Sequence, residues 1–155
     1  MARAAIFVIC FISIVFPSVF AGVLQRNIGP PVTKEDAIAK AKMGADLGFN
    51  LISTSINMYS ASVQYDSSLN AATKQCIVNN LGPVKEAVKV QVQAYLDAVV
   101  QRLSATPDAE VRTAFVQIVK ELFKDSGTVA NIKDNLETEL TDVRETCEEQ
   151  NDNSA

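Results

Sequence analysis

Residues 33–63, TKEDAIAKAKMGADLGFNLISTSINMYSASV, decide the fold, because apolar or small side chains recur there every three or four positions. That spacing places them on one face of an α-helix. Thr33 followed by Glu35 and Asp36 is typical of a capped helix start. The stretch predicts one long amphipathic helix or two collinear ones, with an apolar face formed by Ile38, Ala41, Ala45, Gly48, Ile52, Ile56, Tyr59 and Val63.

Two further helices are expected between residues 66 and 105. Asp66 or Ser67 can cap the second helix, which should stop at the turn-forming residues 79–82, Asn-Asn-Leu-Gly. Pro83 would begin the third helix, where a missing N–H does no harm. Residues 88–94 alternate as a strand would, but the length of the segment and its helix-forming residues favour a helix. The expected apolar faces consist of Leu69, Ala72, Cys76 and Ile77, and of Val84, Val88, Val92, Tyr95, Val99 and Leu103.

The last two helices begin after residue 105. Thr106-Pro107-Asp108 combines a cap, a proline in the first turn and an acid near the N-terminus, and Ser126-Gly127 should end this fourth helix. We therefore expect an all-α, up-and-down bundle of about five amphipathic helices over residues 33–148, followed by a disordered acidic tail at 149–155. The apolar faces of the last two helices consist of Val111, Phe115, Ile118 and Leu122, and of Val129, Ile132, Leu136, Leu140, Val143 and Cys147.

Residues 1–21 have the pattern of a secretory signal peptide. Arg3 supplies the positive charge, residues 6–16 form the apolar run, and short side chains precede a cleavage point after Ala21. The run is shorter than the roughly 20 apolar residues that span a bilayer. We expect a secreted, extracellular protein with an extended leader at 22–32 and no stable membrane insertion.

Cys76 and Cys147 are the cysteines that remain once the signal, with Cys10, is removed. Both fall on expected apolar faces, and thiols pair in oxidising compartments, so we predict a disulfide between the second and fifth helices. It would close a loop of about 70 residues, worth about 4 kcal/mol. Two free thiols do not ordinarily persist in a secreted protein. A zinc site lacks further ligands, because the chain has no histidine.

The residue types present argue against catalysis. Without histidine there is no Ser–His–Asp or Cys–His arrangement. Acidic pairs at 35–36, 137–139 and 148–149 fall on expected polar faces or helix ends, where carboxylates are ordinarily solvated. We expect no enzyme activity, no metal and no cofactor. Removal of the signal leaves 13 basic and 18 acidic residues, a net charge of −5, which argues against a nucleic-acid partner.

The expected core is rich in small and β-branched side chains. Such a bundle can leave a ligand-sized void, although helices can also approach closely and fill the space. Our leading hypothesis is a non-catalytic carrier of a small hydrophobic ligand or lipid. The alternative is a secreted effector, venom or defence-type protein that binds another extracellular protein through its surface. The expected ligand-lining residues are Ile52, Ile56, Tyr59, Val88, Val92, Tyr95, Val99, Phe115, Ile118 and Leu136.

The expected helix count and the amphipathic pattern resemble those of exchangeable apolipophorin-type five-helix bundles. The resemblance lies in architecture alone, and no sequence motif carries it. Those bundles open on a lipid surface, which a bridge between the second and fifth helices would resist. The resemblance therefore implies a helical bundle, and the bridge implies one that stays closed.

Overall fold

The computed structural model describes residues 31, 33–124 and 127–152. Within these ranges the chain forms four α-helices and one short 3-10 turn, η1. The elements are α2 (Lys34–Tyr65), α3 (Ala71–Ala105), η1 (Asp108–Glu110), α4 (Val111–Leu122) and α5 (Thr128–Asp152). The expected signal peptide at 1–21 and the expected leader, apart from Pro31, lie outside the described residues.

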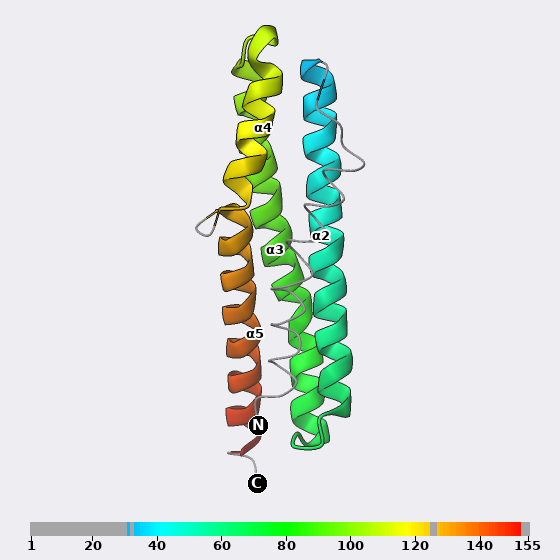
Figure 1. Cartoon of the computed structure of the whole chain (residues 1–155). Coiled ribbons are helices and arrows are strands. Elements are labelled where there is room, and N and C mark those ends of the chain that lie inside the picture. The colour runs from blue at the N-terminus through cyan, green and yellow to red at the C-terminus, as the bar shows by residue number, and fades with distance from the viewer. Residues whose placement is uncertain (1–30, 32, 125–126, 153–155) are drawn as a thin grey trace.

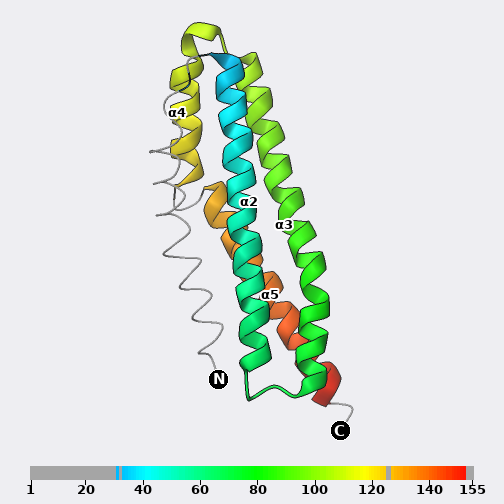
Figure 2. The ribbon, with the colours of Figure 1, turned by 90° about the vertical axis from the view of Figure 1, so that its right-hand side faces the viewer.

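The helices α2 and α3 are antiparallel, lie side by side and run the length of the molecule (Figure 1). α4 packs alongside their upper part and α5 alongside their lower part, so these two shorter helices together take the third position of the bundle (Figures 1 and 2). α3 makes extensive contacts with both α2 and α5. The all-α prediction is confirmed, with four helices in place of about five.

The predicted break before Pro83 is wrong, because α3 continues through it from Ala71 to Ala105. A proline inside a helix removes a backbone hydrogen bond and costs about 3 kcal/mol. The apolar face nevertheless stays in phase across the proline, so burial on both sides offsets that loss. The side chains concerned are each at most 4% exposed: Ile77, Leu81, Val84 and Val88.

The helix starts agree with prediction at α2 but not at α3. The Thr33 hydroxyl accepts a hydrogen bond from the backbone N–H of Asp36, as expected of a cap. α3 is capped by Asn70 and not by Asp66 or Ser67, since the Asn70 side chain accepts from the Thr73 N–H at 2.8 Å. This later start buries Thr73 and leaves Ala72 exposed, so the predicted apolar position of Ala72 is wrong.

The predicted cap at Thr106 is also wrong. Thr106 ends α3, and its hydroxyl donates a hydrogen bond to the Arg102 carbonyl at 2.8 Å. Pro107 then leads into η1, and α4 begins only at Val111. The proline therefore starts a 3-10 turn that connects α3 to α4.

The connection between α4 and α5 requires a glycine. A Cβ atom at Gly127 would lie 2.5 Å from the Glu121 carbonyl oxygen and 2.7 Å from that of Leu122. α5 then continues to Asp152, so the predicted disorder is wrong for residues 149–152, which are helical. Residues 153–155 of the expected tail lie outside the described range.

The buried side chains form two clusters. The lower core cluster lies among α2, α3 and α5, and the upper core cluster among α2, α3 and α4. The upper cluster consists of Ala37, Val99, Leu103, Val111, Phe115 and Ile118. The lower cluster consists of Ile52, Ile56, Tyr59, Val63, Ile77, Leu81, Val84, Val88, Leu136, Leu140 and Cys147.

The lower end of the bundle is held by a disulfide and by a charged cluster. Cys76 in α3 and Cys147 in α5 form the predicted bridge. Arg144 donates to Glu148 at 2.7 Å and to Asp66, in the α2–α3 turn, at 3.4 Å. Hydrogen bonds from the Ser68 hydroxyl and N–H lower the pKa of Asp66, and Arg144 adds to this effect. α5 is thus tied covalently to α3 and by charge to the turn.

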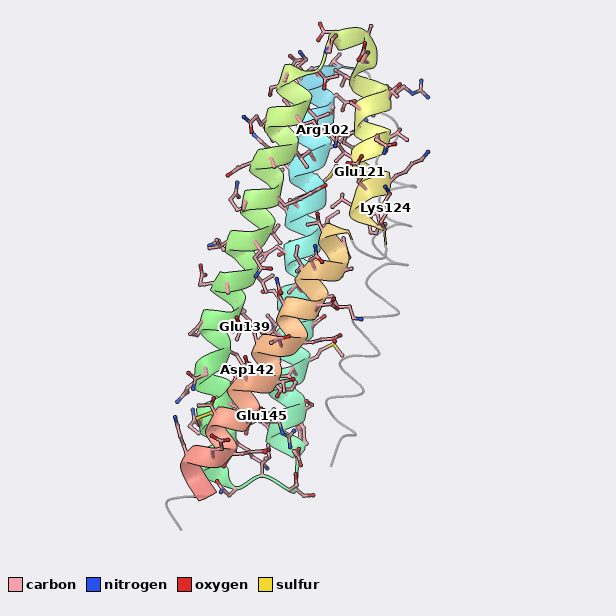
Figure 3. All side chains as sticks on the ribbon, turned by 90° about the vertical axis from the view of Figure 1, so that its left-hand side faces the viewer. Arg102, Glu121, Lys124, Glu139, Asp142 and Glu145 are labelled. Atoms are coloured by element: carbon pink, nitrogen blue, oxygen red, sulfur yellow. A yellow bond between two sulfur atoms is a disulfide. The ribbon has the colours of Figure 1, made fainter. Side chains whose placement is uncertain are left out.

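None of the described helices combines the length and the hydropathy needed to cross a membrane. Exposed acids occupy the outer side of α5, where Glu139, Asp142 and Glu145 are labelled in Figure 3. Charged residues of this kind are typical of the solvent-facing side of an amphipathic helix.

Candidate functional site

An apolar cavity of about 90 Å³ lies at the level where α4 ends and α5 begins. It adjoins both core clusters, since Val99, Phe115 and Ile118 of the upper cluster and Ile52 of the lower cluster line it. The long helix α2 forms one wall through residues on successive turns. These are Lys40, Ala41, Gly44, Ala45, Gly48 and Ile52.

The opposite walls come from the other three α-helices. Their contributions are mostly branched aliphatic and aromatic side chains, with Tyr95 and Thr128 as the two polar residues. α3 supplies Val92, Tyr95, Leu96 and Val99, and α4 supplies Phe115, Ile118, Val119 and Leu122. α5 supplies Thr128, Val129 and Ile132.

The cavity has a local cause in the sequence. Ala41, Gly44, Ala45 and Gly48 have too little bulk to fill the space between α2 and its neighbours. α4 ends at Leu122 and α5 begins at Thr128, so the third position of the bundle passes from one helix to another at this level. The space is partly open to solvent, since lining residues such as Ala45, Val92 and Ile132 are only half-buried. Larger side chains at these positions could fill it.

The surface that the lining residues present to the cavity is almost wholly apolar. The Lys40 ammonium lies 2.8 Å from the Asp36 carboxylate, one turn towards the start of α2. Burial raises the pKa of Tyr95 to about 12; nearby Glu121 adds to the shift and Arg102 opposes it. Its phenol is therefore neutral at physiological pH. The site can therefore bind a ligand through complementary shape and apolar contacts, and its polar groups lie at the margin.

An ion pair closes the outer side of the α3–α4 interface near Tyr95. Arg102 of α3 and Glu121 of α4 point towards one another (Figure 3), with 2.7 Å between the guanidinium nitrogen and the carboxylate oxygen. Hydrogen bonds from Arg102 and from Gln117 hold the pKa of Glu121 below its usual range. The pair links α4 to α3 at the protein surface, and because both side chains are exposed it adds little to stability.

The structure brings together six of the ten predicted ligand-lining residues: Ile52, Val92, Tyr95, Val99, Phe115 and Ile118. The other four, Ile56, Tyr59, Val88 and Leu136, belong to the lower core cluster and do not line the cavity. Burial raises the pKa of Tyr59, and the Arg144 guanidinium beside the hydroxyl opposes that shift. Sequence reasoning did not assign Gly44, Ala45 or Val129 to the site, although glycine and alanine at helical spacing were the available signal.

The acidic pairs considered as catalytic candidates take part in ion pairs along the helices. Asp36 pairs with Lys40, Glu137 with Lys133 at 3.5 Å and Glu148 with Arg144. Among the described residues there is no group of three or more histidine, cysteine, aspartate or glutamate side chains that could hold a metal ion.

Comparisons of the chain with protein-family models, with curated proteins and with solved structures find no significant match.

Proposed function

We propose that this protein is a secreted, non-catalytic carrier that binds a small apolar ligand in the cavity between its two core clusters. The observation that carries the proposal is the apolar cavity of about 90 Å³. Protein interiors are normally close-packed, and a concave, almost wholly apolar pocket is a favourable place for an apolar guest. Filling the gap with ligand would recover contacts that the empty fold lacks.

The chemistry of the lining supports a carrier over an enzyme. A nucleophile needs a base to activate it, and the chain has no histidine to serve as one. Tyr95 keeps its proton at neutral pH because burial raises its pKa to about 12. Lys40 is paired with Asp36. These groups favour binding and release without a chemical step.

The size of the cavity restricts the ligand. Pockets for drug-sized molecules usually measure about 300–1,000 Å³, and this cavity is well below that range. A bulky lipid does not fit the space as it stands. The proposal therefore concerns a slender or very small apolar molecule.

Secretion is the part of the proposal that rests on the sequence pattern of residues 1–21. The Cys76–Cys147 disulfide supports it, because such bridges persist in oxidising compartments. The bridge ties the lower end of α3 to α5, away from the cavity. It therefore stabilises the bundle without crossing the ligand site.

The alternative, an effector or defence-type protein that acts through its surface, receives less support. The large apolar side chains that are exposed in the described chain are spread over three helices, and scattered residues of this kind are ordinary on protein surfaces. They are Met43, Met58 and Tyr65 on α2, Val90 on α3 and Val116 on α4.

Native mass spectrometry of the secreted, purified protein tests the carrier function, together with binding of xenon, a small apolar probe of cavities. We expect a co-purified ligand, or xenon binding to the emptied protein. Ala45→Leu, inside the cavity, should abolish binding. Ala61→Leu, the same change at an exposed position of α2, should not alter it. Absence of both ligand and xenon binding in the wild-type protein would rule out the carrier function.

A further inference from the structure

We infer that the ligand is a single unbranched hydrocarbon chain, which lies along the bundle axis with its polar end beside Lys40. The inference rests on the proposed function and names the class of ligand that the carrier would take. It follows from the shape of the cavity, from the closure of its lower end and from the polar pair near its upper end.

The cavity is long in relation to its volume. Its α2 wall runs from Lys40 to Ile52, which at 1.5 Å per residue is about 18 Å along the helix axis. A volume of about 90 Å³ spread over that length leaves a narrow passage between the helices, which is partly open to solvent. A ring or a branched skeleton needs width that the passage lacks, whereas an extended chain uses its length.

The two ends of the passage differ in polarity. At the lower end, Ile52 and its neighbour Ile56 are almost fully buried in the lower core cluster. Near the upper end, the side chains of Lys40 and Asp36 are 17% and 35% exposed, and so retain contact with water. A polar head buried at the lower end would lose its hydrogen bonds to water without replacement. The chain should therefore lie with its tail towards Ile52.

The pair at the upper end favours a hydroxyl head. The ammonium of Lys40 is a donor and the carboxylate of Asp36 is an acceptor, 2.8 Å apart. A hydroxyl group on the ligand can accept a hydrogen bond from Lys40 and donate one to Asp36. A carboxylate head would instead bring a second negative charge close to Asp36. Primary alcohols are thus the appropriate probes.

Calorimetric titration with three isomeric or near-isomeric alcohols tests the shape. The probes are 1-octanol, 2-ethyl-1-hexanol and cyclooctanol, which have the same number of carbon atoms and one hydroxyl group each. We expect 1-octanol to bind about tenfold more tightly than the other two alcohols. A tenfold difference in affinity corresponds to the burial of just under two more methylene groups, which is what the branched and cyclic alcohols would leave outside the passage. From 1-hexanol to 1-octanol the affinity should rise roughly fourfold per methylene.

The outcomes separate this inference from the proposed function. If the branched or cyclic alcohol binds the cavity as tightly as 1-octanol, the inference of an unbranched chain is wrong, while the carrier function stands. If none of the alcohols binds and xenon does not bind either, both are wrong. Each titration is repeated with Ala45→Leu, and loss of binding in this variant shows that the alcohol binds in the cavity.

The orientation has its own test. Lys40→Met keeps the aliphatic stem of the side chain and removes its charge. It should weaken 1-octanol binding about fivefold, which is the effect expected from losing one ordinary hydrogen bond. Lys42→Met, at an exposed position of the same helix, is the matched control and should bind as the wild type does. A nitroxide on the head of the chain should broaden amide NMR signals of residues 37–41. Broadening around Ile52, or unchanged binding by Lys40→Met, would overturn the orientation.

Discussion

Cys76 in α3 and Cys147 in α5 are joined by a disulfide across 71 positions of the chain. Next to the bridge, the Asn80 side-chain nitrogen lies 3.7 Å from the sulfur of Cys76 and 3.9 Å from that of Cys147. The bridge fixes the lower end of the third position in the bundle. The upper end, α4, is held by packing and by the Arg102–Glu121 ion pair. Among the residues that the structure describes, a covalent bridge therefore closes the lower end of the bundle and none closes the upper end.

The double substitution Cys76→Ser with Cys147→Ser should lower the free energy of unfolding by about 4 kcal/mol. The reason is that the bridge removes the loop-closure entropy of a long segment from the unfolded chain. Urea unfolding followed by circular dichroism measures the change, and a reducing agent should destabilise the wild type but not the variant. A variant as stable as the wild type would contradict the prediction.

Gly82→Ala should stabilise the protein by up to about 1 kcal/mol. Gly82 lies in the interior of α3, where glycine is a poor helix former, and a Cβ atom there would meet no other part of the protein within 4 Å apart from the chain neighbours and the backbone of α3 itself. The ring of Pro83, the next residue, disfavours a helical backbone at a preceding residue that carries a Cβ, and this offsets part of the gain. Gly127→Ala is the contrasting variant and should destabilise, because its Cβ would collide with backbone carbonyls of α4. Thermal unfolding of both variants checks this, and destabilisation by Gly82→Ala would contradict it.

The helical periodicity allowed the fold class and the disulfide to be predicted from sequence, but not the division into helices. Pro83 and Gly82 indicate a break by local propensity, whereas the continuous burial of Leu81 and Val84 outweighs it in the folded chain. Thr106-Pro107-Asp108 has the local pattern of a helix start, but in the folded chain Thr106 ends α3 and Pro107 leads into the 3-10 turn.

The candidate site could be predicted only in part, for a related reason. Helical spacing identifies which residues face inwards, and it identified Val92, Val99 and Ile118 correctly. It does not reveal the level along the axis at which packing fails. That level depends on where α4 gives way to α5 beside the small residues Gly44 and Ala45, which is a property of the three-dimensional arrangement.

Stability should fall in acid partly through Asp66. Hydrogen bonds from Ser68 and the charge of Arg144 lower the pKa of Asp66 in the folded protein. A lowered pKa contributes stability that is present above the unfolded value of 3.8 and is lost as the pH falls through the folded value. Asp66→Asn should therefore reduce the pH dependence of unfolding below about pH 5. Urea denaturation of both proteins at a series of pH values measures this. If the free energy of unfolding of Asp66→Asn falls in acid as steeply as that of the wild type, the prediction is contradicted.

Ala45→Leu should raise the free energy of unfolding by up to about 2 kcal/mol, because its added carbon atoms would bury apolar surface in the pocket. Ala61→Leu, at an exposed site of the same helix, should stay within about 0.5 kcal/mol of the wild type. Combined with loss of ligand binding, a stabilised Ala45→Leu protein would indicate a gap that is retained for function. A strongly destabilised variant would show that the position has no space to fill.

The central claim is that an apolar ligand enters the cavity, and methyl NMR during a titration with 1-octanol tests it most directly. The account predicts saturable shifts of the methyl signals of Val92, Val99, Ile118 and Ile132, which line the cavity. The methyl signals of Val90 and Val116, exposed on α3 and α4, should remain in place. Shifts confined to these two exposed valines, or no saturable shifts at all, would contradict the claim.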